Sequence, residues 1–199
     1  RHVEDRAVAR LRRGAGLGRF LLVGGVGSGL IVLGRCTSWG RVMEKSKVSL
    51  PLLGGCLCGA VRYSLNGAPL MVHVCHCHDC QSVSGSAYTL TALVATAALA
   101  LTGPLETVAR VTTRGRQVRN TVCEKCRAGL TSSDAARPDF TGLRAGTLDD
   151  ASWAVPIAQT FVRSAIPWAI IPGVEQVDPK DFNYAKLSAA WRATAPIFS

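Results

Sequence analysis

The sequence predicts a mainly β fold with a short C-terminal helix, organised around clustered cysteines. Short runs of alternating apolar and polar residues recur between residues 61 and 162, as expected of half-buried strands. Helical spacing of apolar residues is confined to the C-terminal end. Seven of the eight cysteines stand in three groups, at spacings of one or two intervening residues. These three observations favour a small β domain that is held together at its cysteine groups.

Composition and charge indicate one globular domain. The chain has 199 residues, of which 48% are apolar and 18% are charged, and this length suits a single domain with a substantial core. The net charge of +10 is unevenly spread: residues 1–50 hold ten Lys or Arg against three Asp or Glu, and residues 51–199 hold thirteen against ten. The folded part is therefore only mildly basic, and we expect it to bind no nucleic acid.

The first 46 residues predict a basic, glycine-rich extension. An arginine-rich start precedes an uncharged run from Phe20 to Gly34. That run is shorter than the about twenty apolar residues that a membrane span needs, so we expect no membrane partner. A targeting segment is the alternative. We expect residues 1–46 to be disordered or not native, and residues 47–199 to form the domain.

Alternating side chains predict seven strands in the domain. They cover residues 61–65, 70–74, 88–92, 105–111, 117–122, 140–145 and 157–162. The first predicted strand ends at the Asn66-Gly67 pair, which is typical of the turn in a β-hairpin. A helix is predicted to begin at residues 179–181, with these apolar residues on one face: Tyr184, Leu187 and Trp191.

The cysteine groups predict metal binding and not disulfide bonds. Cysteines of disulfide frameworks are usually spread along small secreted domains, whereas tight groups suit metal ligation in a reducing compartment such as the cytoplasm. The groups are Cys56 and Cys58, Cys123 and Cys126, and Cys75, Cys77 and Cys80. Thiolates at such spacing are typical ligands of tetrahedral zinc. We therefore expect a zinc protein.

Ligand counting predicts one closed and one open zinc site. The two cysteine pairs, here called the four-cysteine cluster, can complete a structural tetrahedron from neighbouring strands. The remaining three cysteines, here called the cysteine trio, leave a fourth position open, as catalytic zinc sites do. The alternative is that a nearby histidine closes the second site: His73, His76 or His78. Cys36, in the extension, is not expected to be a ligand.

Four motifs occur in a fixed order between residues 54 and 150. They are Gly54-Gly-Cys-Leu-Cys-Gly-Ala-Val-Arg-Tyr63, Cys75-His-Cys-His-Asp-Cys-Gln-Ser-Val-Ser-Gly-Ser86, Cys123-Glu-Lys-Cys126 and Gly146-Thr-Leu-Asp-Asp150. In these motifs the chain resembles the glutathione-dependent formaldehyde-activating enzyme family, whose eukaryotic relatives include centromere protein V. The resemblance covers roughly residues 52–192. One departure is Arg127, which stands where the family usually has a glycine in left-handed backbone.

The resemblance implies a fold, two zinc ions and an activity. The fold is a small, zinc-containing, β-tent-like sheet structure, in which the four-cysteine cluster holds a structural zinc and the cysteine trio holds the catalytic zinc. The activity is that of a carbon–sulfur lyase of the S-hydroxymethylglutathione synthase kind. It acts on glutathione, or a similar thiol, and on formaldehyde or a related aldehyde. We expect the substrate thiolate to take the open zinc position and attack the aldehyde carbon.

Further site residues are expected next to the trio. His76 or His78 is a candidate proton relay, the alternative being that both only make structural hydrogen bonds. Candidates for binding the substrate are Gln81, Ser84, Gly85 and Ser86, the alternative being that they form the turn into the next strand. Candidates for attracting substrate carboxylates are Arg62, Arg114, Arg116 and Arg119, the alternative being a solvated strand face. Asp149 and Asp150 are expected to cap a turn.

A non-catalytic zinc module that binds protein or nucleic acid is the rival interpretation. The basic N-terminal stretch favours it, whereas no run of aromatic and basic residues supports a nucleic-acid platform. The open three-sulfur site favours the enzyme. In a module every zinc would be fully ligated and inert, and in an enzyme one zinc would respond to thiols.

Overall fold

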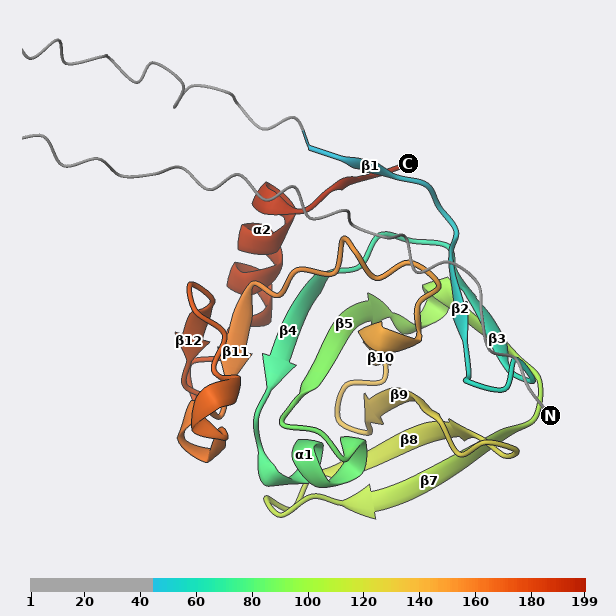
Figure 1. The fold of residues 1–199 in the computed structure, drawn as a ribbon, viewed down its shortest axis with the longest axis horizontal. Helices are drawn as coiled ribbons and strands as arrows, with labels where there is room; N and C mark the ends of the chain where they lie inside the picture. The colour runs from blue at the N-terminus through green and yellow to red at the C-terminus, as the bar shows by residue number, and fades with distance from the viewer. Residues whose placement is uncertain (1–44) are drawn as a thin grey trace, which may run out of the picture. The chain divides into compact units, whose positions relative to one another are not determined.

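The computed structural model describes residues 45–199, which contain thirteen strands and two α-helices (Figure 1). The mainly β class with a short C-terminal helix, predicted from the sequence, is confirmed. Expectations for residues 1–44 lie outside the described residues, and so does Cys36. No helix among residues 45–199 is both long and apolar enough to cross a membrane.

The larger sheet has eight strands in the order β12-β11-β4-β5-β10-β9-β8-β7. They are β4 (Met71–Cys75), β5 (Thr89–Ala95), β7 (Leu105–Val111), β8 (Gln117–Cys123), β9 (Gly129–Asp134), β10 (Phe140–Arg144), β11 (Ala158–Thr160) and β12 (Glu175–Val177). Strand β11 runs parallel to both β4 and β12, whereas the other pairs are antiparallel. Because β4 and β11 are parallel, Cys75 and Thr160 lie side by side where both strands end.

The smaller sheet corrects one expectation about a turn. It consists of β2 (Leu52–Gly55), β3 (Arg62–Leu65) and β6 (Leu99–Thr102). The predicted hairpin at Asn66-Gly67 does not form, because β3 pairs with β2 and β6 whereas β4 pairs with β5 and β11. The Asn66-Gly67 segment instead carries the chain from the smaller sheet to the larger one. A separate two-stranded pair joins β1 (Lys47–Val48) to β13 (Ile197–Phe198).

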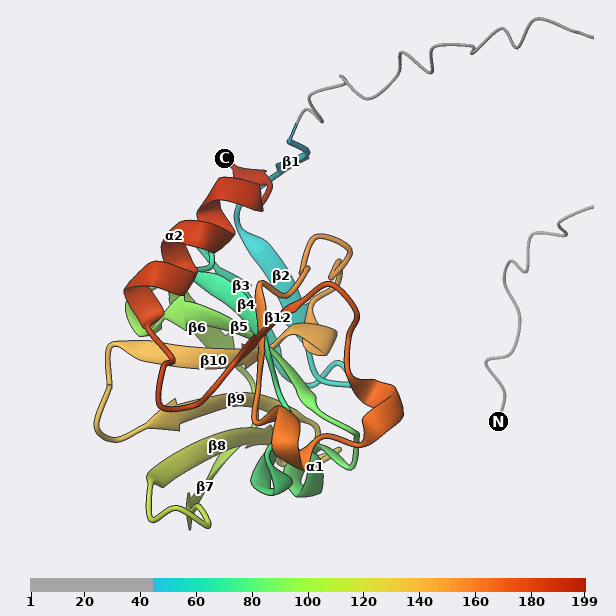
Figure 2. The ribbon, with the colours of Figure 1, turned by 90° about the vertical axis from the view of Figure 1, so that its left-hand side faces the viewer.

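Two helices flank the sheets. The C-terminal helix α2 (Tyr184–Thr194) begins after Asn183, whose side chain accepts a hydrogen bond from the Lys186 N–H, and it packs against β4 (Figure 2). Leu187 and Trp191 are buried on the predicted face. The expectation that only the C-terminal end is helical is wrong, because α1 (His78–Ser84) follows β4. Helix α1 has seven residues and none of them is buried, so it leaves no apolar periodicity in the sequence.

Alternation within the larger sheet separates a core face from a cavity face. Side chains of successive residues point to opposite sides of a strand, so paired residues on neighbouring strands share a face. One row of paired residues is buried in the core: Val72, Ala92 and Leu143. The next row lies on the opposite face: His73, Thr91 and Arg144. This second face carries the polar side chains that line the site described below.

Candidate metal and substrate site

The four-cysteine cluster joins the two sheets. Cys56 and Cys58 follow β2 of the smaller sheet, whereas Cys123 ends β8 of the larger one and Cys126 lies in the turn after it. The sequence predicts that the two pairs lie on neighbouring strands. They come instead from different sheets. The four sulfurs lie within 4.8 Å of one another. The cluster can thus bind one metal ion that connects the two sheets.

The sulfur spacing in this cluster fits zinc. Four bonds of about 2.3 Å in a tetrahedron place sulfur atoms about 3.8 Å apart. The Sγ atoms of Cys56 and Cys58 are 3.5 Å apart, and those of Cys58 and Cys123 are 3.9 Å apart. The backbone N–H of Val61 also donates to the Cys56 sulfur at 3.2 Å.

Close contact between the thiols of the four-cysteine cluster lowers the pKa of one cysteine and raises that of another. Burial raises the pKa of Cys56, but the Val61 N–H and the neighbouring thiols outweigh it and lower that pKa to about 6. The Ala60 N–H lowers the pKa of Cys58, but hydrogen bonds with the other cysteines outweigh it and raise that pKa to about 11. One thiolate is thus stabilised by protonated neighbours, an arrangement in which a bound cation would replace the shared protons.

Arg127 adopts a backbone conformation typical of glycine in the turn that contains Cys123 and Cys126, here called the second knuckle. Its φ is 62°, in the left-handed region that β-carbons disfavour. Its N–H donates to the Cys123 carbonyl at 2.9 Å, and its guanidinium forms an ion pair with Glu106. The departure from the family pattern therefore preserves the knuckle's backbone at a cost in strain.

The cysteine trio is formed by the junction of β4 and α1. Cys75 is the last residue of β4, Cys77 caps α1, and Cys80 lies in its first turn. The Cys77 sulfur accepts the Cys80 N–H at 3.4 Å and lies 3.5 Å from the Cys75 sulfur. The three sulfurs fall within 4.8 Å of one another, so they also fit one metal ion. Hydrogen bonds with Cys77 raise the pKa of Cys75, and hydrogen bonds from Cys75 lower the pKa of Cys80.

No histidine joins the trio as a ligand within residues 45–199. His76 is fully buried, with its Nε2 3.2 Å from Oε1 of Gln159. The Gln159 amide nitrogen donates to two carbonyls, those of Ile171 and Val174, so its oxygen accepts and His76 Nε2 donates. His78 is the first residue of α1. Neither histidine lines the cavity beside the trio.

A cavity of about 340 Å³ opens beside the trio, and all three cysteines line it. Its floor is the polar face of the larger sheet, and its charged lining is mainly cationic. The arginines in the lining are Arg110, Arg114, Arg116, Arg137 and Arg144, and the acidic residues are Asp79 and Asp134. Five guanidinium groups against two carboxylates give the cavity a positive potential that favours anionic ligands.

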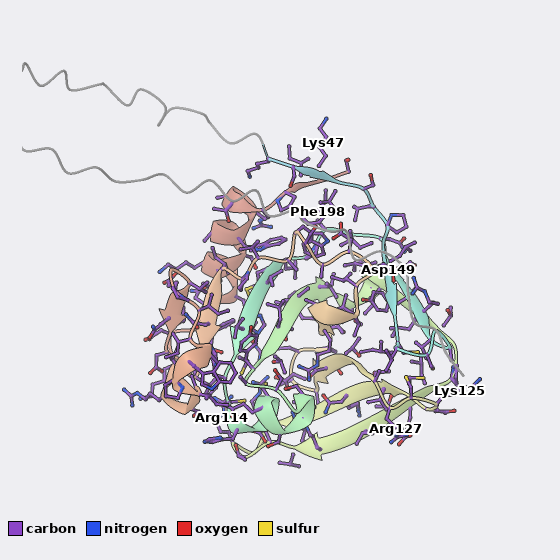
Figure 3. All side chains as sticks on the ribbon, viewed as in Figure 1. Lys47, Arg114, Lys125, Arg127, Asp149 and Phe198 are labelled. Carbon is purple, nitrogen blue, oxygen red and sulfur yellow. The ribbon has the colours of Figure 1, made fainter. Side chains whose placement is uncertain are left out.

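Most of these arginines already have a partner. Arg110 pairs with Asp79, and Arg116 and Arg137 share Asp134. Arg114 lies over the ring of Phe161, 4.1 Å from its centre. Arg114 is beside α1, at the opposite end of the β7–β8 hairpin from Arg127 (Figure 3).

The remaining sequence candidates lie away from the cavity. Arg62 pairs with Asp149, Arg119 is exposed, and Asp150 accepts the Ser152 N–H at 2.9 Å, as a turn-capping residue does. None of the four expected substrate-binding residues lines the cavity: Gln81, Ser84, Gly85 and Ser86.

The contacts of those four residues are structural. The Gln81 amide donates to the carbonyls of His76 and Ser164 at 2.6 and 2.7 Å, which ties α1 to the loop after β11. Ser84 Oγ donates to the Cys80 carbonyl at 2.8 Å. Gly85 ends α1 with a φ of 61°. These contacts give no support to a role in substrate binding, and that role stays a prediction.

Comparison with known proteins bears on the same residues. The profile of the glutathione-dependent formaldehyde-activating enzyme family matches residues 51–164, more than half of the chain. The chain belongs to this family. The matched range contains both cysteine clusters and α1 and ends before the C-terminal helix. No curated relative matches the sequence. Among solved structures, the crystal structure of a Rhodobacter sphaeroides protein is similar, with 19% sequence identity and a TM-score of 0.40. The alignment covers 49% of this chain and 88% of that chain.

Both clusters of this family member meet the requirements for zinc. Each offers thiolates alone, which are soft ligands, at distances that suit tetrahedral coordination. They differ in completeness, because one supplies four sulfurs and the other three. Sequence reasoning missed the cavity residues Arg110, Arg137 and Arg144, which no local motif marks.

Proposed function

We propose that the protein is a zinc-dependent carbon–sulfur lyase-type enzyme that combines glutathione, or a similar thiol, with formaldehyde or a related aldehyde. The observation that carries this proposal is the position of the cysteine trio on the wall of the cationic cavity. The family's name supports the choice of glutathione and formaldehyde. Clustered free thiols also support a reducing compartment, the cytoplasm, as the place of action.

The reaction joins two molecules without oxidation or reduction. The substrate thiol loses its proton, its sulfur forms a bond to the aldehyde carbon, and the aldehyde oxygen gains a proton. Zinc held by the trio would supply the position at which the thiol ionises near neutral pH. The cavity arginines attract the two carboxylates of glutathione, and holding both reactants in the cavity raises their effective concentration.

Zinc content with and without an intact trio tests the proposal. The wild-type chain is expected to hold two zinc ions and a Cys77→Ala variant one. Addition of glutathione should change the ultraviolet charge-transfer spectrum of a cobalt-substituted wild type but not that of the variant. Cys36→Ala, which removes the one cysteine that the sequence places in none of the three groups, is the matched control and should behave as the wild type.

Catalysis is then measured as formation of the thiol–aldehyde adduct, corrected for the uncatalysed reaction. We expect acceleration by the wild type and by Cys36→Ala, and none by Cys77→Ala. The enzyme proposal would be contradicted, and the non-catalytic zinc module favoured, by two tightly held zinc ions whose sites do not respond to glutathione, together with no acceleration of adduct formation.

A further inference from the structure

Arg144 differs from the other arginines of the cavity in its position. It ends β10 and is paired with Thr91 of β5, which is in turn paired with His73 of β4. Cys75 lies two residues beyond His73 on the same face, which is about 7 Å along the strand. Two strand spacings, about 10 Å, separate β10 from β4, with β5 between them, and Arg144 lines the cavity on this face of the sheet.

Arg144 also differs in its partners. Within residues 45–199 neither Arg144 nor Arg114 belongs to an ion pair, whereas Arg110, Arg116 and Arg137 each pair with an aspartate. Arg114 instead lies over the ring of Phe161, so among the five cavity arginines of this range Arg144 alone has neither a carboxylate nor an aromatic ring as its partner. Burial lowers the pKa of Arg144, and the negative charge of the Cys80 sulfur offsets part of that effect. Because no carboxylate pairs with this partly buried cation and the sulfur charge offsets only part of the cost of its burial, an anion that arrives with the ligand would be favoured beside it.

The reaction creates an anion close to the trio. When sulfur attacks an aldehyde, the C=O electron pair moves to the oxygen, which becomes negative before it is protonated. That oxygen is two bonds from the attacking sulfur, whereas the carboxylates of glutathione are several bonds further away. A fixed cation beside the trio therefore matches the aldehyde oxygen better than it matches a carboxylate.

Other donors near the trio are neutral or already engaged. Thr160 Oγ1 donates to the Val74 carbonyl at 3.3 Å, and Arg110 is held by Asp79. Thr89 Oγ1 is buried without a hydrogen-bond partner, but a hydroxyl stabilises negative charge less than a guanidinium does. Arg114 is stacked on the Phe161 ring. Among the cavity arginines, the charged donor that remains is Arg144.

We propose that Arg144 donates the hydrogen bonds that hold the aldehyde oxygen and stabilises its negative charge while the carbon–sulfur bond forms. This inference rests on the proposed function. The guanidinium stays protonated throughout, and the oxygen takes its final proton from solvent. Arg114 is left to bind the carboxylates of the thiol substrate, together with Arg116 and Arg137, which share the single carboxylate of Asp134 and so keep one positive charge in excess.

Three variants of the zinc-loaded, full-length chain separate these roles. Arg144→Met removes the charge and keeps much of the apolar stem, and Arg144→Lys keeps the charge. Arg119→Met is the matched control, because Arg119 is an exposed arginine on β8 that does not line the cavity. For each variant the zinc content, the Kd of glutathione by calorimetry without aldehyde, and kcat with formaldehyde are measured.

Loss of a preorganised donor to a developing oxyanion lowers kcat by about 100-fold or more. We expect that loss in Arg144→Met, with two zinc ions retained and the glutathione Kd within about threefold of the wild type. Arg144→Lys should recover part of kcat, and Arg119→Met should match the wild type.

Other results overturn the inference. An unchanged kcat in Arg144→Met would do so, and a weaker glutathione Kd at unchanged kcat would assign Arg144 to a carboxylate instead. Loss of zinc from Arg144→Met would assign it to the metal centre. If the wild type itself does not accelerate adduct formation, the proposed function fails and this inference fails with it. If the wild type is active and Arg144→Met is equally active, only this inference fails.

Discussion

The two cysteine clusters use the same ligand chemistry in opposite surroundings. The four-cysteine cluster lies between the two sheets, with Cys56 and Cys123 buried in the hydrophobic core, Cys126 partly buried and Cys58 exposed, and none of its cysteines lines the cavity. The trio lies at the other end of the β7–β8 hairpin, where the turn after β7 contacts Asp79 of α1 (Figure 1). All three of its cysteines are only partly buried and face the cavity. Whether a cysteine group can do chemistry is thus decided by its neighbours as much as by its spacing.

The largest expected contrast is between serine substitutions in the two clusters. Cys123→Ser changes a fully buried cysteine of the cluster that joins the two sheets, a candidate ligand of the structural zinc. Because structural zinc contributes about 10 kcal/mol or more to folding, comparable to the whole stability of a domain, we expect this variant to be unfolded. Cys80→Ser should remain folded and lose one zinc ion.

Circular dichroism melts and zinc analysis of the two serine variants check this contrast. A Cys123→Ser protein that melts within a few degrees of the wild type would show that the four-cysteine cluster is dispensable for folding. An unfolded Cys80→Ser protein would show that the trio is structural too.

Metal removal should sharpen the same comparison. With a chelator in excess under native conditions, we expect one zinc ion to leave rapidly from the trio, which opens onto the cavity. The second should leave at least about ten times more slowly, because four thiolates hold it, two of them buried, and no ligand position is open to the chelator. Release is followed with a zinc-sensitive dye while circular dichroism reports the fold. Loss of structure during the fast phase would contradict this assignment.

The sequence predicted which cysteines group into the two clusters but not the surroundings that distinguish them. Ligand spacing is a local property, so Cys75, Cys77 and Cys80 could be singled out directly. The cavity depends on the register of strands that are far apart in the chain. Arg144 therefore looked like any charged residue at a strand end, and it became distinctive only when the register aligned it with His73.

The misjudged elements have related causes. Asn66-Gly67 has the composition of a hairpin turn, but the strands on either side of it find their partners in different sheets. Strand β9 was not predicted because four polar residues follow Leu130 in a strand that ends at Asp134. Its neighbours β8 and β10 determine its conformation, which is information that the local pattern does not contain.

A smaller effect separates the two roles of Cys77, as a candidate metal ligand and as the N-cap of α1. Its sulfur is a candidate ligand and also caps α1 by accepting the Cys80 N–H. With the trio's zinc removed, Cys77→Ala should be less stable than Cys77→Ser by about 1 kcal/mol, because serine is a good N-cap and alanine is not. Urea unfolding of both variants measures the difference. Equal stabilities would mean that the cap contributes nothing without metal.

The smallest effect concerns the left-handed residue beside each cluster. Gly85 ends α1 with a φ of 61°, and Arg127 follows the second knuckle with a φ of 62°. Gly85→Ala should destabilise the protein by about 1 kcal/mol, because a β-carbon is disfavoured there. Arg127→Gly should stabilise it by about 0.5 kcal/mol, since the strain removed exceeds the greater freedom of glycine in the unfolded chain.

Loss of the exposed ion pair with Glu106 costs little in Arg127→Gly. The matched control is Arg119→Gly, where the arginine lies in the extended strand β8 and glycine should only destabilise. Urea unfolding with zinc bound at both sites measures all three variants. If Arg127→Gly proved less stable than the wild type, the Glu106 pair would contribute more to the closed knuckle than its exposure suggests. The backbone strain at Arg127 would then be offset by its own ion pair with Glu106, next to the four-cysteine cluster.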